Sequence, residues 1–159
     1  MSETAQQYDV LLQQATALFD GERHFVANCA NLCALLFMTL EDVNWAGVYL
    51  MDGDELIVGP FQGLPACTRI GMGKGVCGTA AQSRQIQRVD NVHEFDGHIA
   101  CDSASNSEIV LPIVRGDTLL GVLDIDSPIY ARFSQHDEAG LSRIVDVLVA
   151  SSDSAGARS

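Results

Sequence analysis

Two pairs of apolar segments, each joined by a link too short for a helix, constrain the fold most. Residues 45–51 (WAGVYLM) and 56–61 (LIVGPF) flank DGDE, and residues 108–114 (EIVLPIV) and 118–126 (TLLGVLDID) flank the turn RGD. Asp-Gly and other tight turns between apolar runs are strong signals of β-hairpins. Because such short links join antiparallel strands, the sequence predicts two hairpins of a largely antiparallel sheet.

Apolar residues at helical spacing flank these hairpins on both sides. They occupy residues 8–19 and 24–40 before the first hairpin and residues 134–150 after the second, where a serine is followed three residues later by an acid. We therefore expect one α+β domain over residues 1–150, with the N- and C-terminal helices packed on one face of the sheet and active-site loops on the other. Residues 151–159 are expected to be a disordered tail.

The segment between the hairpins has a weaker pattern. Residues 71–83 (GMGKGVCGTAAQS) place glycines before a short helix, and residues 86–89 (IQRV) predict an edge strand. Residues 90–106 show no regular pattern. A loop of that length in a compact domain is usually functional or disordered.

Acidic residues outnumber basic ones, which argues against nucleic acid and anionic membranes as partners. The chain has 21 Asp and Glu against nine Lys and Arg, a formal net charge of −12 at pH 7. This charge opposes sequence-independent binding to nucleic acid and to anionic membranes, so neither is expected as a partner. No apolar run is long enough to span a membrane, and the N-terminus lacks the pattern of a secretory signal, so we expect a cytoplasmic protein.

The chain has five cysteines, an odd number that argues against a fixed disulfide framework in the cytoplasm. Cys29 and Cys33 lie four residues apart on a predicted helix and therefore on one apolar face. Cysteine in such a place packs as a small hydrophobic residue, and no second pair at comparable spacing supports a metal site. We interpret both as core residues.

The other three cysteines, Cys67, Cys77 and Cys101, lie in loops or at the ends of elements, which favours redox chemistry. Cys77 follows a glycine-rich turn near a predicted helix N-terminus, where unpaired backbone N–H groups stabilise a thiolate. A zinc site built with His93 or His98 stays open as an alternative, although no zinc-ligand spacing is present.

Three carboxylates are placed to meet beside the second hairpin. Asp124 and Asp126 alternate along one strand and point to the same face, and pairing through the RGD turn brings them near Glu108 on the partner strand. Clustered acids in a partly closed pocket raise one another's pKa, so one of them can hold a proton and donate it to an oxygen. Trp45 and Tyr49 point to one face of their own strand and form an apolar wall that suits a small ligand or an ordinary core.

Several segments together resemble the free methionine-(R)-sulfoxide reductases, single-domain enzymes of the GAF fold. The segments are NWAGVYLM, GPFQGLPACTRI, GKGVCGTA, VHEFDGHIACDSASNSEIVLPI, GVLDIDS and RFSQHDEAGL. The most specific part is the set of three cysteines at spacings of 10 and 24 residues, because a generic GAF domain is not expected to carry all three.

This resemblance implies reduction of free L-methionine (R)-sulfoxide to methionine. Cys101 matches the catalytic nucleophile of the family, which attacks the sulfoxide sulfur and becomes a sulfenic acid. Cys67 is the first choice for the resolving thiol that converts the sulfenic acid into a disulfide, and Cys77 matches a third cysteine that can enter disulfides. No cofactor is implied beyond thioredoxin, the external reductant of the disulfide.

The resemblance also assigns roles to the predicted pocket. Glu108, Asp124 and Asp126 match the acids that hold and protonate the sulfoxide, and Trp45 and Tyr49 match the wall around the methyl group of the substrate.

Specificity for the free amino acid is expected from loop closure. Residues 61–77 and 90–106 would cover the pocket and leave no exit for a polypeptide, and acids near the ammonium group of the ligand would add to this. Two other functions stay open: a sensory GAF module that binds a cyclic nucleotide or another small ligand, and a thiol redox switch without turnover. GAF domains commonly dimerise through helices, so a homodimer is a further expectation.

Overall fold

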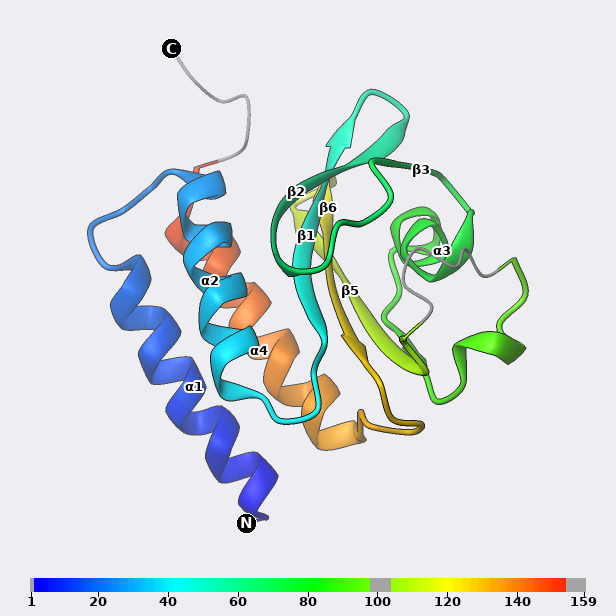
Figure 1. The fold of residues 1–159 in the computed structure, drawn as a ribbon. Coiled ribbons are helices and arrows are strands. Elements are labelled where there is room, and N and C mark those ends of the chain that lie inside the picture. The colour runs from blue at the N-terminus through cyan, green and yellow to red at the C-terminus, as the bar shows by residue number, and fades with distance from the viewer. Residues whose placement is uncertain (1, 98–103, 154–159) are drawn as a thin grey trace.

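Six antiparallel strands form one sheet in the order β3-β2-β1-β6-β5-β4 (Figure 1). The computed structural model describes residues 2–97 and 104–153. The strands are β1 (Trp45–Asp52), β2 (Glu55–Gly63), β3 (Arg69–Gly71), β4 (Gln87–Val89), β5 (Ser107–Arg115) and β6 (Thr118–Ser127). The two predicted hairpins are β1–β2 and β5–β6, and the predicted edge strand is β4, so these expectations are confirmed.

Helices lie on both sides of this sheet (Figure 1). The helices in the described part of the chain are α1 (Glu3–Phe19), α2 (Phe25–Thr39), α3 (Gly75–Ser83), α4 (Gln135–Ser151) and the short 3-10 helix η1 (Val92–Glu94). The N- and C-terminal helices α1, α2 and α4 lie together, and α3 lies on the opposite face, so the predicted α+β arrangement is confirmed. None of the described helices has both the length and the apolar character that crossing a membrane requires.

Some element boundaries differ from the sequence-based expectation. α1 begins earlier because the Ser2 hydroxyl caps it by accepting a hydrogen bond from the backbone N–H of Ala5 at 3.1 Å. β3 was not predicted, because a strand of three residues is too short for a periodic pattern, and it forms only as a partner of β2. Within the loop predicted to be irregular, η1 forms a single short turn.

The end of the chain is ordered through residue 153. Ser151 still belongs to α4, and the buried Ser152 hydroxyl accepts a hydrogen bond from Asn28 Nδ2 at 2.9 Å. Asp153 forms an ion pair with Arg23 at 3.2 Å. The expectation of a disordered tail is therefore wrong for residues 151–153, and residues 154–159 lie outside the described residues.

The first and last helices are joined by a close contact. A Cβ atom on Gly140 of α4 would fall 2.2 Å from Cγ of Tyr8 of α1, so only glycine permits this approach. The approach lets the buried Tyr8 hydroxyl donate a hydrogen bond to Asp137 Oδ1 at 2.7 Å. Asp137 also accepts a hydrogen bond from the backbone N–H of Ser134 at 2.7 Å, which completes the capping box and confirms the predicted helix start.

Side chains along β5 and β6 alternate between the two faces of the sheet, and the two faces have different surroundings. Ile109 and Leu111 of β5, with Leu123 and Ile125 of β6, face α1, α2 and α4 and are fully or almost fully buried. Burial of each such side chain contributes about 1.5–3 kcal/mol. The side chains between them point to the opposite face, because successive residues of a strand alternate. That face carries the candidate site.

Candidate active site

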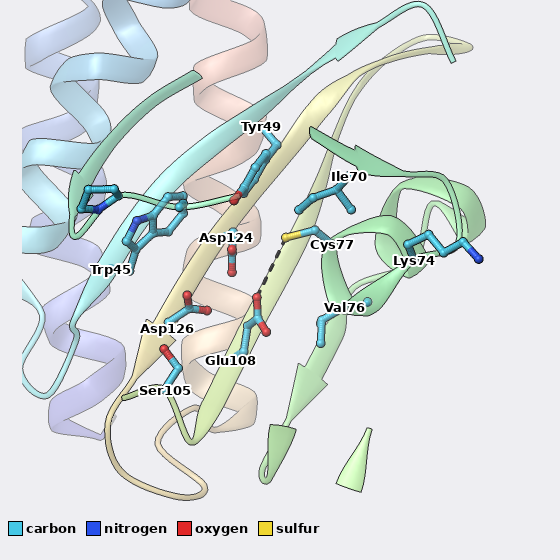
Figure 2. A pocket seen from close by; sticks show the side chains of 13 residues that line it. Trp45, Tyr49, Ile70, Lys74, Val76, Cys77, Ser105, Glu108, Asp124 and Asp126 are labelled. Atoms are coloured by element: carbon cyan, nitrogen blue, oxygen red, sulfur yellow. Dashed lines mark hydrogen bonds between the residues drawn. The ribbon is translucent and has the colours of Figure 1, made fainter. Parts of the chain in front are cut away.

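A pocket lies on the face of the sheet that α1, α2 and α4 leave free, where β1, β5 and β6 meet α3 and the loop after β2 (Figure 2). It is lined by Trp45, Tyr49, Pro65, Ala66, Ile70, Lys74, Gly75, Val76, Cys77, Ser105, Glu108, Asp124 and Asp126. The three predicted acids and the two predicted aromatic residues are all among them. The structure therefore brings the predicted carboxylates and the predicted wall into one pocket.

Strand register determines how the acids meet. Glu108 of β5 pairs directly with Asp126 of β6, and Asp126 in turn pairs with Trp45 of β1. In the next row on the same face, Asp124 lies opposite Gly47 of β1. The predicted proximity of Glu108 to the two aspartates is confirmed, and two regular antiparallel pairings produce it.

Burial changes the acid–base properties of these carboxyl groups. Glu108 is 8% exposed and Asp124 is 4% exposed. Loss of solvation raises the pKa of Glu108 well above its ordinary value, and the neighbouring Asp124 raises it further. Loss of solvation also raises the pKa of Asp124, with added repulsion from Asp126. Such carboxyl groups retain protons that ordinary acids have lost and can donate them to an oxygen.

Aromatic rings form the apolar wall of the pocket. The rings of Trp45 and Tyr49 stack with centroids 5.7 Å apart, and Phe61 stacks on Trp45 at 5.2 Å. Gly47 makes room for this arrangement, because a Cβ atom there would lie 2.4 Å from the Trp45 ring. The indole Nε1 of Trp45 donates a hydrogen bond to the carbonyl oxygen of Leu64 at 3.0 Å. This bond ties the wall to the loop that leads to Cys67.

Cys77 does not have the environment predicted for it. It is the third residue of α3, is 5% exposed, and its Sγ lies 3.9 Å from Glu108 Oε2 (Figure 2, dashed line). Loss of solvation raises the pKa of the Cys77 thiol well above its ordinary value, and repulsion from Asp124 and Glu108 adds to this. These effects outweigh the favourable field of the helix N-terminus. The expectation of a stabilised thiolate at this position is therefore wrong.

Cys29, Cys33 and Cys67 lie in the kinds of place that the sequence predicts. Cys29 and Cys33 are fully buried free thiols on α2. Burial raises the pKa of Cys33 to about 12 and also raises that of Cys29, so both are inert core residues, as predicted. Cys67, in the loop between β2 and β3, is half-buried and disulfide-bonded. Cys101, the predicted nucleophile, lies outside the described residues.

Seven lining residues were not identified from the sequence, and six of them lie between residues 65 and 76. They are Pro65, Ala66, Ile70, Lys74, Gly75, Val76 and Ser105. Most belong to the segment 61–77 that was expected to cover the pocket, and this expectation could have identified them. Ser105 comes from the second expected covering segment, and its hydroxyl accepts a hydrogen bond from Asn44 Nδ2 at 3.4 Å.

One group of pocket residues has the composition of a metal site. The Sγ of Cys77 and one carboxylate oxygen each from Glu108 and Asp124 lie within 4.8 Å of one another. His93, considered as a zinc ligand, is exposed, lies with its Nε2 2.8 Å from Asn106 Oδ1, and does not line the pocket. His98 lies outside the described residues.

Comparisons with known proteins identify the fold and include free methionine-R-sulfoxide reductases. Residues 8–151 match the GAF domain family. A free methionine-R-sulfoxide reductase of Escherichia coli (strain K12) is 55% identical over 138 residues, which cover 87% of this chain and 84% of that protein.

Two solved structures share the fold and a substantial part of the sequence. The free methionine-R-sulfoxide reductase of Neisseria meningitidis in complex with its substrate aligns with a TM-score of 0.90 at 39% identity, covering 95% of this chain and 91% of that chain. The fRMsr of Staphylococcus aureus in complex with substrate aligns with a TM-score of 0.87 at 49% identity, covering 91% of this chain and 94% of that chain.

Proposed function

This chain belongs to the GAF domain family, among the free methionine-R-sulfoxide reductases, and we propose that it reduces free L-methionine (R)-sulfoxide to L-methionine by cysteine chemistry. The observation that carries the proposal is the meeting of buried acids and an aromatic wall in one pocket. A protonated carboxyl group suits the sulfoxide oxygen, and the stacked rings of Trp45 and Tyr49 suit the methyl group on the same sulfur.

In the first step, the thiolate of Cys101 attacks the sulfoxide sulfur while Glu108 or Asp124 donates a proton to the oxygen. The sulfur–oxygen bond of the substrate breaks, and the substrate sulfur gains two electrons. Methionine leaves, and the oxygen ends on Cys101 as a sulfenic acid. The raised pKa values of Glu108 and Asp124 support their role as proton donors, because an ionised carboxylate has no proton to give.

In the second step, the thiol of Cys67 condenses with the sulfenic acid, forming a disulfide and releasing water. The dithiol of thioredoxin then reduces this disulfide by exchange. The disulfide-bonded state of Cys67 and its place in a loop at the pocket support its assignment as the resolving thiol. Cys77 takes a secondary part, since its protonated thiol donates to Glu108 and is poorly suited to attack.

Selection of the free amino acid follows from the shape and charge of the same pocket. The loop residues Pro65 and Ala66, together with Lys74 at the start of α3, border it. We expect these segments to leave no path for a polypeptide, while the carboxylates attract the ammonium group of the ligand.

We also place the enzyme in the cytoplasm and expect it to pair with a second copy. Thioredoxin recycling needs a reducing compartment. Leu18 of α1 and Met38 of α2 are large apolar residues, 42% and 77% exposed, on the outer surface of the helices. Sedimentation equilibrium of the full chain tests the pairing, which a purely monomeric result would contradict.

The decisive experiment measures turnover of the two separated epimers of free methionine sulfoxide, with thioredoxin recycling. We expect methionine only from the R epimer, no turnover by Cys101→Ser, and a loss of about 10²–10⁴-fold in kcat/KM for Glu108→Gln. Cys29→Ala, which changes a core thiol, is the matched control and should retain activity. If the fully reduced protein forms no methionine from either epimer, the proposal fails, and calorimetry with cyclic nucleotides becomes the next test.

A further inference from the structure

We propose that Cys77, Glu108 and Asp124 bind a thiophilic divalent cation, with Zn²⁺ as the best fit, and that this ion blocks the substrate pocket reversibly. The thiol sulfur and one oxygen from each carboxyl group lie within 4.8 Å of one another. The three residues come from α3, β5 and β6, so strand pairing and helix packing hold them together (Figure 2). The ion is an inhibitor and not a resident cofactor.

Asp124 shows independently that the pocket has an unfilled position for a ligand. Its Oδ1 atom is buried and has no hydrogen-bond partner, and the side chain as a whole is 4% exposed. An orphaned carboxylate oxygen in such a place costs free energy until something donates to it or coordinates it. The pocket has room beside these side chains for one ion and a water ligand.

The charge around the pocket favours a cation. The acids Glu108, Asp124 and Asp126 meet there. Among the ion pairs found in residues 2–97 and 104–153, none links the two proposed carboxylate ligands, Glu108 and Asp124, to Lys or Arg. The basic lining residue, Lys74, is exposed, and its side chain points away from the acids (Figure 2). A cation entering the pocket therefore meets the negative charge that Glu108 and Asp124 develop as they ionise.

The ligand set selects zinc over the common hard cations. A tetrahedral zinc ion with a sulfur at about 2.3 Å and an oxygen at about 2.1 Å holds those two atoms about 3.6 Å apart. Cys77 Sγ and Glu108 Oε2 are 3.9 Å apart, so this pair needs a shift of a few tenths of an ångström. The pairs that involve Asp124 lie within 4.8 Å, so rotation of its side chain by about an ångström or less completes the site. Mg²⁺ and Ca²⁺ prefer six or more oxygen ligands and have no use for a thiolate. On binding, the thiol proton passes to solvent and a zinc–sulfur bond forms, with no change in oxidation state.

Zinc at this position would occupy the same acids that the substrate needs. This part of the inference rests on the proposed function. The ion should therefore raise the apparent KM for free methionine sulfoxide without lowering kcat at saturating substrate, whereas Mg²⁺ should have no effect.

The binding test uses the full-length Cys67→Ser/Cys101→Ser protein, kept reduced with a phosphine, so that Cys77 is the single thiol of the pocket region. Co²⁺ is the spectroscopic probe, and its near-ultraviolet thiolate band is read before Zn²⁺ displaces it. We expect one ion per chain and a thiolate band. Adding Cys77→Ser should abolish the band and weaken Zn²⁺ binding by more than about 100-fold, beyond the loss typical of an outer-shell partner.

Asp124→Asn serves as a second variant in case the serine substitution disturbs folding, and it should weaken Zn²⁺ binding while the thiolate band persists at higher Co²⁺. Cys29→Ala is the matched control and should change neither the Co²⁺ thiolate band nor the Zn²⁺ affinity. Absence of the thiolate band, or unchanged Zn²⁺ affinity in a folded Cys77→Ser protein, overturns the site. Because binding is read without turnover, the two proposals fail separately. Zn²⁺ binding through Cys77 in this variant, together with no turnover by the reduced wild type, refutes the reductase proposal alone.

Discussion

Replacing Asp124 by asparagine should reduce the loss of stability that occurs as pH rises from acidic to neutral. The pKa of Asp124 is raised in the folded protein, above all by loss of solvation. The folded protein therefore holds a proton that the unfolded chain has already released. Such a group contributes its full stabilisation below its unfolded pKa, and that stabilisation is lost as pH rises toward the raised folded pKa.

The size of the effect follows from proton linkage. Within that pH window, one such carboxyl group lowers the unfolding free energy by about 1.36 kcal/mol for each pH unit. For a domain of this length, that corresponds to about 3–5 °C in Tm per pH unit. Asparagine does not titrate, so the variant lacks the decrease in unfolding free energy with pH that Asp124 causes. Because Asp124 also raises the pKa of Glu108, the corresponding decrease caused by Glu108 becomes smaller in the variant. The Tm of the variant relative to that of the wild type should therefore increase with pH by at least the amount expected for one carboxyl group.

The assay is thermal unfolding followed by circular dichroism at half-unit steps from pH 5 to pH 7, with a chelator present so that no metal contributes. The difference in Tm between Asp124→Asn and the wild type should widen steadily over this range. Loss of a hydrogen-bonding group would add an offset that does not depend on pH. Asp54→Asn, in the exposed turn between β1 and β2, is the control and should run parallel to the wild type. A constant difference for Asp124→Asn would refute the reasoning.

Three further predictions concern contacts that hold the wall and the helices. Trp45→Phe removes the hydrogen bond to the Leu64 carbonyl, and steady-state kinetics should show KM raised about tenfold with a smaller change in kcat. Gly140→Ala should lower the unfolding free energy by about 1–3 kcal/mol in urea titrations, although alanine is the better helix former, because its Cβ would meet the Tyr8 ring. Tyr8→Phe should cost about 1–2 kcal/mol in the same assay, because it removes the buried hydrogen bond to Asp137; an unchanged midpoint would show that bond to be dispensable.

The acid cluster was predictable because strand geometry is local. Asp124 and Asp126 share a face by simple alternation, and a tight turn brings them beside Glu108. The start of α4 was equally readable, since the serine and the acid of its capping box are three residues apart.

The environment of Cys77 was not predictable by the same means. Its position near a helix N-terminus is a local property, but its burial against Glu108 and Asp124 depends on how α3 docks on β5 and β6. No spacing in the sequence encodes that docking. β3 was missed for a related reason, because three residues form a strand there only when β2 offers an edge.

The alternation of residues 122–126, the part of β6 that follows the bulge at Leu120, also limits how the gene can vary. Leu123 and Ile125 fill the interior under the helices, while Asp124 and Asp126 supply the pocket. Inserting or deleting a single codon within residues 122–126 would exchange the two sets, burying carboxylates under the helices and placing aliphatic side chains where a proton donor is needed. Natural changes in chain length should therefore accumulate in the turns around Gly53 and Gly116, where the backbone reverses and neither interior is affected.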